Sequence, residues 1–243
     1  MPLEVTDWAP RNALAPVGQV VLVVVDIQGG GLPPAFAHKA GYMPGREERN
    51  PKAVELVNAF RAKGQPVVFI QEVHFPSLLD IGRELDGAED VHCVEGMPQT
   101  ALHPGLEPLP HEYLVRKRRY SAFFGSELDI VLKGYQARTL VLIGGMTDVC
   151  VHYTAVDAHQ LDYHFRTVSD MVIGSSVKAH EAALRAMKYL QRDSLVTLAA
   201  VHDWLGGLPD APMPGADAMT SAGGSGSHAV RAAGVLRGRR ACR

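Results

Sequence analysis

Residues 139–155, TLVLIGGMTDVCVHYTA, decide the fold because they predict a buried strand, a turn and then a helix. Residues 139–143 are an uninterrupted apolar run, which is typical of a strand buried on both faces, and two glycines end it. The apolar-rich segment 149–159 then predicts a helix with Cys150 in its first turn. Unpaired backbone N–H groups and the helix dipole at that position favour the thiolate, which is the nucleophilic form of cysteine.

The alternative for Cys150 is a purely structural role. A single cysteine in apolar surroundings is more often a buried core residue than a nucleophile, so this segment alone favours packing. Cys93 is a rival nucleophile, but it follows His92 in an irregular segment and lacks the strand-to-helix context. Further residues are therefore needed to indicate chemistry.

Apolar runs alternate with helical patterns along most of the chain. Further strands are expected at residues 20–26, 66–71, 113–115, 164–172 and 194–200. Helices are expected to begin at Asn50, with Pro51 in the first turn, and after Ser126 and Ser176. This alternation predicts an α/β fold, a three-layer α/β/α doubly wound, mainly parallel sheet in one domain over residues 1–205.

The C-terminal residues 206–243 differ from the rest in composition. They are rich in Gly, Pro, Ala and Ser and lack apolar periodicity, which predicts a disordered tail. A short arm that docks on a neighbouring subunit is the alternative.

Composition limits the class of partner. The 243 residues carry a net charge of -2 and no basic stripe before the last few residues, so a small-molecule substrate is expected and nucleic acid is not. No apolar run approaches the roughly 18 residues of a membrane span. Three widely separated cysteines and the lack of a signal peptide pattern favour a reducing, cytoplasmic location.

Reactive side chains occur where strands are expected to end. Asp26 closes the first strand, and active sites of open α/β sheets lie at the carboxyl ends of strands, although a capping role is equally expected from position alone. Residues 116–119 are four adjacent cations between apolar neighbours, so at least one should point inward, where burial requires a counter-charge. Together, Asp26, Lys117 and Cys150 would form an activated nucleophile, since the carboxylate can take the thiol proton and the lysine favours the thiolate.

The irregular segment 72–110 is expected to form a wall or lid of the pocket. It contains His74, His92 and His103 and several acids, but no His-x-His, Asp-x-His or His-Glu-x-x-His spacing. A bound metal is therefore not expected.

Three motifs in this order resemble the isochorismatase-like cysteine hydrolases, a family that includes nicotinamidases and hydrolases of N-carbamoylsarcosine, ureidoacrylate and biuret. They are VVVDIQ at 23–28, KRRYSAFFGSEL at 117–128 and GGMTDVCV at 144–151. The resemblance covers roughly residues 20–201 and implies a catalytic triad of Asp26, Lys117 and Cys150. It also implies an oxyanion hole from the backbone N–H groups of Met146 and Cys150, a cis peptide bond between Gly145 and Met146, no cofactor, and a homo-oligomer, either a dimer or a tetramer.

The activity that the resemblance implies is cleavage of a C–N bond in a small amide or ureido substrate, through a thioester and with release of ammonia or an amine. KRRYSAFF and the GRELDG segment at 82–87 look closest to ureido-hydrolysing members, including biuret hydrolases. The missing Asp-x-His metal signature counts against a pyridine amide. Three glycines after Gln28 replace the acidic and aromatic residues of many relatives, which leaves one side of the pocket unassigned. A vinyl ether hydrolase and a catalytically silent binding protein are the alternatives.

Four residues are candidates for substrate binding. Gln28 and Arg119 offer directional donors, and Tyr120 and Phe124 offer a stacking face for a small planar substrate. Core packing is the favoured alternative for Phe124.

Overall fold

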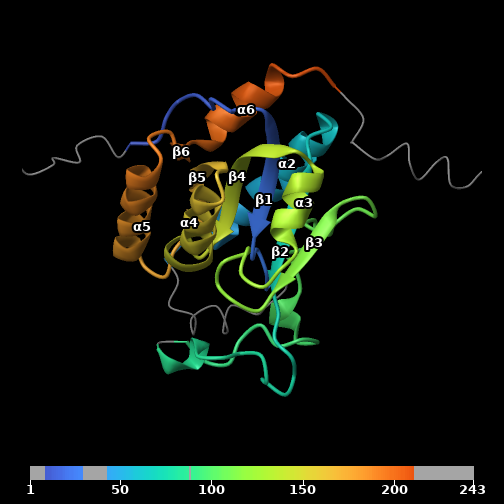
Figure 1. Cartoon of the computed structure of the whole chain (residues 1–243), viewed down its shortest axis with the longest axis vertical. Coiled ribbons are helices and arrows are strands. Elements are labelled where there is room, and N and C mark those ends of the chain that lie inside the picture. The colour runs from blue at the N-terminus through green and yellow to red at the C-terminus, as the bar shows by residue number, and fades with distance from the viewer. Residues whose placement is uncertain (1–8, 30–42, 88, 211–243) are drawn as a thin grey trace, which may run out of the picture.

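The fold is built on a six-stranded sheet in the order β3-β2-β1-β4-β5-β6, seen in a computed structural model that describes residues 9–29, 43–87 and 89–210 (Figure 1). All neighbouring strands pair in parallel. The strands are β1 (Gln19–Val25), β2 (Val67–Glu72), β3 (Tyr113–Lys117), β4 (Ala137–Gly145), β5 (His164–Ile173) and β6 (Leu195–Val196). The α-helices are α2 (Arg46–Ala62), α3 (Leu128–Gly134), α4 (His152–Gln160), α5 (Val177–Leu190) and α6 (Leu198–Gly206). The predicted doubly wound parallel sheet is confirmed.

The sheet is buried on both faces because its central strands carry apolar side chains in both directions. Along β1, Val21 and Val23 pack in the core that includes side chains of α3, α4 and α5. Leu22 and Val24 pack in the opposite core, which includes side chains of α2 and α6. A parallel strand covered on both sides reads as a continuous apolar run, which is why these strands are visible in the sequence.

The strand order decides where the polar strand ends meet. Strand β1 lies between β2 and β4, and β2 lies between β1 and β3. Asp26 follows β1, while Glu72 and Lys117 are the last residues of β2 and β3. In open α/β sheets the ligand crevice lies beyond the carboxyl ends of the strands, where the strand order reverses. In this sheet the order reverses between β1 and β4, so the crevice is expected beyond the carboxyl ends of these two strands.

Two element boundaries differ from the prediction by four residues. Helix α2 begins at Arg46 rather than at Asn50, because Glu47 and Glu48 occupy its first turn, where negative side chains are favourable, and Pro51 lies inside the helix. The predicted strand at residues 194–200 ends early, since the Thr197 side chain accepts a hydrogen bond from the backbone N–H of Ala200 and caps α6.

The predicted tail falls mostly outside the described residues, which end at Asp210. The assignment of residues 1–205 to one domain and the expected homo-oligomer stay predictions. None of the helices in the described ranges is long and apolar enough to cross a membrane.

Gly144 allows β4 to approach β1 closely at this edge. Its φ is 127°, and a Cβ atom there would lie 1.9 Å from the carbonyl oxygen of Val25. We predict that Gly144→Ala lowers the free energy of unfolding by about 3 kcal/mol or more, because backbone atoms must shift. The midpoint of thermal unfolding, followed by circular dichroism, should fall by about 6 °C or more.

Gly134→Ala is the matched control for this prediction. Gly134 ends α3, and a Cβ atom there meets nothing within 4 Å. This variant should unfold at the wild-type temperature or slightly above it. Equal unfolding temperatures for the two variants would contradict the steric argument.

Candidate active site

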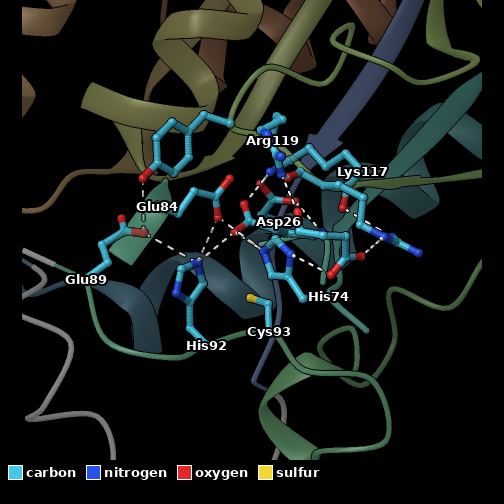
Figure 2. A network of polar contacts seen from close by, with 12 residues as sticks. Asp26, His74, Glu84, Glu89, His92, Cys93, Lys117 and Arg119 are labelled. Atoms are coloured by element: carbon cyan, nitrogen blue, oxygen red, sulfur yellow. Dashed lines mark hydrogen bonds and ion pairs between the residues drawn. The ribbon is translucent and has the colours of Figure 1, made fainter. Parts of the chain in front are cut away.

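Asp26, Lys117 and Cys150 come together at the carboxyl edge of the sheet. The Lys117 Nζ atom lies 2.9 Å from Asp26 Oδ2 and 3.5 Å from Cys150 Sγ. Figure 2 shows Lys117 directed toward Asp26. Only 1% of Lys117 and 5% of Cys150 are exposed. Lys117 is therefore the inward-pointing cation predicted from the basic run, and its counter-charge is supplied by another strand.

Cys150 lies in a π-helical turn, η4 (Thr147–Val151), rather than in the first turn of a regular α-helix. Helix α4 continues directly from η4, so the predicted strand-turn-helix arrangement holds while the local winding differs. Single π-helical turns often occur at functional sites. The peptide bond between Gly145 and Met146 is cis, at the expected position.

Glu72 is a member of the site that the sequence analysis missed. Its Oε2 atom forms an ion pair with Lys117 Nζ and lies 3.4 Å from Cys150 Sγ. Glu72 and Lys117 are paired across β2 and β3 in the sheet register. The available signal was an acid one residue beyond the predicted strand 66–71. Lys117 thus has two carboxylates as neighbours, Asp26 and Glu72.

Burial shifts the pKa values of both the acid and the thiol in this site. Burial raises the pKa of Asp26 to about 6, with a smaller contribution from Glu72 and opposition from Lys117. Burial also raises the pKa of the Cys150 thiol well above its usual value, although Lys117 opposes this. Lys117 favours the thiolate, as expected, but desolvation of the charged sulfur outweighs its effect on this pKa. The raised pKa favours the thiol form of Cys150, and the carboxylates of Asp26 and Glu72 are nearby acceptors for its proton.

A second cluster adjoins Glu72 on the side away from Lys117. His92 Nε2 lies 2.9 Å from Glu72 Oε1, and His74 Nε2 lies 3.2 Å from Glu84 Oε2 (Figure 2). The carboxylates raise the pKa of each histidine to about 9, although burial opposes the shift and is the largest effect on His74. We call Glu72, His74, Glu84 and His92 the histidine–glutamate cluster.

The histidine–glutamate cluster has the donor set of a divalent cation site. One ligand atom from each of its four residues lies within 4.8 Å of all the others. The ring nitrogens of His74 and the carboxylate oxygens of Glu84 are buried, and within the described residues they contact one another as an ion pair without a well-aligned hydrogen bond. Imidazole and carboxylate groups in this combination suit first-row divalent metals. The expectation of no metal stays untested, and the Glu-x-His spacing at 72–74 is the signal that could have indicated this cluster.

A cavity of about 570 Å³ lies beside the cluster. Its walls include Gly82, Glu84, Arg119, Tyr120, Phe124 and Tyr153. Three of the four predicted substrate-binding residues are among them. Phe124 is 64% exposed, so the core-packing interpretation is wrong. Cys150 does not itself line this cavity, and Glu84 belongs to both the cavity and the cluster.

Gln28, the remaining candidate for substrate binding, contacts backbone groups instead. Its Oε1 atom accepts a hydrogen bond of 3.0 Å from the N–H of Glu72. Its Nε2 group donates to the carbonyl oxygens of Glu72 and Thr100, at 2.9 and 2.8 Å. The side chain therefore fixes the end of β2.

Known proteins resemble this chain in sequence and in fold. The Isochorismatase domain family matches residues 20–200. The chain belongs to the isochorismatase-like hydrolase family. Its curated relatives include the ureidoacrylate amidohydrolase RutB of Pseudomonas savastanoi pv. phaseolicola, which is 27% identical over 234 residues covering 86% of this chain and 89% of the relative.

Solved structures of the family share the fold. An isochorismatase family protein from Desulfovibrio vulgaris is 30% identical, with a TM-score of 0.66 over 77% of this chain and 98% of that one. The N-carbamoylsarcosine amidase of Thermoplasma acidophilum is 26% identical, with a TM-score of 0.58 over 74% of this chain and 96% of that one. The predicted family resemblance is confirmed.

The buried charge balance around Lys117 can be tested by unfolding. We predict that Lys117→Met lowers the free energy of unfolding by about 3 to 5 kcal/mol, because two buried carboxylates lose their counter-charge. The double variant Lys117→Met/Glu72→Gln should recover part of that loss, since one of these carboxylates is then neutral. Urea unfolding followed by circular dichroism measures both. A double variant less stable than Lys117→Met would contradict the proposed balance.

Proposed function

We propose that this protein is a cysteine amidohydrolase that cleaves the C–N bond of a small amide or ureido substrate through a thioester. The observation that carries the proposal is the buried Lys117 ammonium, placed within 3.5 Å of the Cys150 sulfur and 2.9 Å of the Asp26 carboxylate. Such an arrangement supplies a nucleophile, a proton acceptor and a fixed positive charge. The names of two relatives, a ureidoacrylate amidohydrolase and an N-carbamoylsarcosine amidase, support the same reaction class.

The first step forms a tetrahedral intermediate, which precedes the thioester. Because Cys150 rests as a thiol, its proton moves to Asp26 as the sulfur attacks the substrate carbonyl carbon. The carbonyl oxygen becomes an oxyanion, which the backbone N–H groups of Met146 and Cys150 stabilise. One such donor contributes about 3 to 4 kcal/mol in a comparable hydrolase.

The second half of the reaction releases both products. Asp26 gives the proton to the departing nitrogen, the C–N bond breaks, and ammonia or an amine leaves an acyl or carbamoyl thioester on Cys150. Water then attacks this carbon while Asp26 takes one of its protons. The S–C bond breaks, the acid product leaves, and Asp26 returns that proton to the sulfur, which restores the thiol. Lys117 stays protonated throughout, since its carboxylate neighbours outweigh burial and hold its pKa well above the usual value. A cation held by the histidine–glutamate cluster would add positive charge near these groups.

Arg119 supports a ureido substrate. Its guanidinium lines the cavity and donates to the carbonyl oxygens of Asp80 and Arg118, but pairs with no carboxylate in the described part of the chain. Arg118, in contrast, pairs with Asp80. A guanidinium presents directional donors that suit a ureido carbonyl or carboxylate, and Tyr120 adds a flat apolar wall. We propose biuret or a ureido acid as the substrate type.

An ammonia-release screen with a Cys150→Ala variant tests the proposed function. The substrates are biuret, ureido acids, N-carbamoyl amino acids, nicotinamide and simple amides. Wild-type protein should release ammonia from at least one ureido compound, and Cys150→Ala should lower kcat by at least about a thousandfold, since it removes the nucleophile. Cys93→Ala is the matched control and should retain the wild-type rate. A Cys150→Ala protein that folds and stays active would eliminate the mechanism.

The pH dependence of kcat/KM should follow the protonation of Asp26. The raised pKa of about 6 means that Asp26 is protonated, and unable to accept the thiol proton, below that pH. We predict that kcat/KM rises with pH through about 6 and then levels off toward neutral pH. The profile is measured on the best substrate, with circular dichroism confirming that the protein stays folded. A rising limb centred near the ordinary carboxyl value of about 4 would contradict the role given to Asp26.

A further inference from the structure

The Glu72 carboxylate divides its two oxygens between two groups of residues. Oε2 forms the ion pair with Lys117 and lies 3.4 Å from the Cys150 sulfur. Oε1 lies 2.9 Å from His92 Nε2 and 3.6 Å from His74 Nε2. Contacts on Oε1 therefore orient the carboxylate so that Oε2 faces the nucleophile.

The backbone of Glu72 is held as firmly as its side chain. Its N–H group donates to Asp26 Oδ1 and to Gln28 Oε1, each at 3.0 Å, and its carbonyl oxygen accepts from Gln28 Nε2. Only 4% of the residue is exposed. With both ends fixed, Glu72 provides a rigid acceptor to which the flexible lysine side chain must adapt.

The Lys117 ammonium has three hydrogens and three neighbouring acceptors. They are Asp26 Oδ2, Glu72 Oε2 and Cys150 Sγ. A lysine side chain is long and rotates freely about its bonds, so a single carboxylate would leave the direction of the other two hydrogens unspecified. Two carboxylates on adjacent strands restrict the ammonium so that its third hydrogen faces the sulfur.

We propose that Glu72 is a positioning residue for the reaction, a second carboxylate that holds the Lys117 ammonium against the Cys150 sulfur. The proposal rests on the proposed function, because it gives Glu72 a part in the same site. Glu72 acts through Lys117 and lies outside the residues that line the cavity.

Kinetics of Glu72→Gln test the proposal. The amide keeps the size of the side chain but loses the charge-assisted bond to Lys117, which should lower kcat about 10- to 100-fold. KM should change less than about threefold, because Glu72 does not line the cavity. A loss confined to KM, or an unchanged kcat, would overturn the proposal. Should Glu72→Gln not fold, Glu72→Asp is the second variant, because it keeps the charge on a shorter side chain. It should also lower kcat and change KM little.

Two other glutamates serve as comparisons. Glu95 pairs with Arg116, the neighbour of Lys117 on β3, and both side chains are 43% exposed. Glu95→Gln should therefore leave kcat unchanged. Glu84→Gln alters the histidine–glutamate cluster without removing a carboxylate from Lys117, so its effect on kcat should be several-fold smaller than that of Glu72→Gln. Equal losses would show that Glu72 acts only through the cluster, which would overturn the proposal.

Crystal structures of the wild type and of Glu72→Gln give a readout that is independent of turnover. The wild type should keep the Lys117 Nζ atom in hydrogen-bond distance of Cys150 Sγ, and Glu72→Gln should show it turned away. An ammonium that keeps its contact with the sulfur in Glu72→Gln would overturn the proposal even if kcat fell. If the wild type hydrolyses none of the screened substrates, the proposed function fails, whereas this structural comparison still decides the role of Glu72.

Discussion

The buried ammonium of Lys117 is the constraint on which the site depends. Taking an unpaired charge out of water costs several kcal/mol, so a lysine with 1% exposure must have anionic neighbours. The sheet supplies them, because β2 lies between β1 and β3 and carries Glu72 at the same level as Lys117. Asp26 approaches from the end of β1 and completes the balance of charge.

In the proposed mechanism, this balance of charge allows a buried thiol to serve as the nucleophile. Desolvation keeps Cys150 protonated at rest, and the same burial raises the pKa of Asp26 to about 6, which makes it a stronger base than an exposed carboxylate. Glu72 remains ionised, since Lys117 and the two histidines outweigh burial and lower its pKa. The pKa values of the two carboxylates are thus shifted in opposite directions, which fits the proposed role of Asp26 in proton exchange and of Glu72 as a counter-ion.

The cavity beside the site is lined in part by loops. The family shares the parallel sheet, whereas the cavity walls come partly from the irregular segment after β2, which contains Gly82 and Glu84, and partly from the segment after β3, which contains Arg119 and Tyr120. Loops tolerate change better than buried strands do, so substrate preference can change while the charges at the strand ends stay fixed. Glu84 lines the cavity and shares the histidine–glutamate cluster with Glu72, which contacts Lys117.

The sequence by itself determined the sheet, the residues at its strand ends and the three side chains that meet there, Asp26, Lys117 and Cys150. Continuous apolar runs are local signals, and the motifs around Asp26, Lys117 and Cys150 are contiguous, so neither requires knowledge of the tertiary structure. Only the tertiary structure decided that Glu72 joins them and that the sulfur is a thiol. The first depends on the pairing of distant strands and the second on burial, and both arise from contacts between segments that are far apart in the chain.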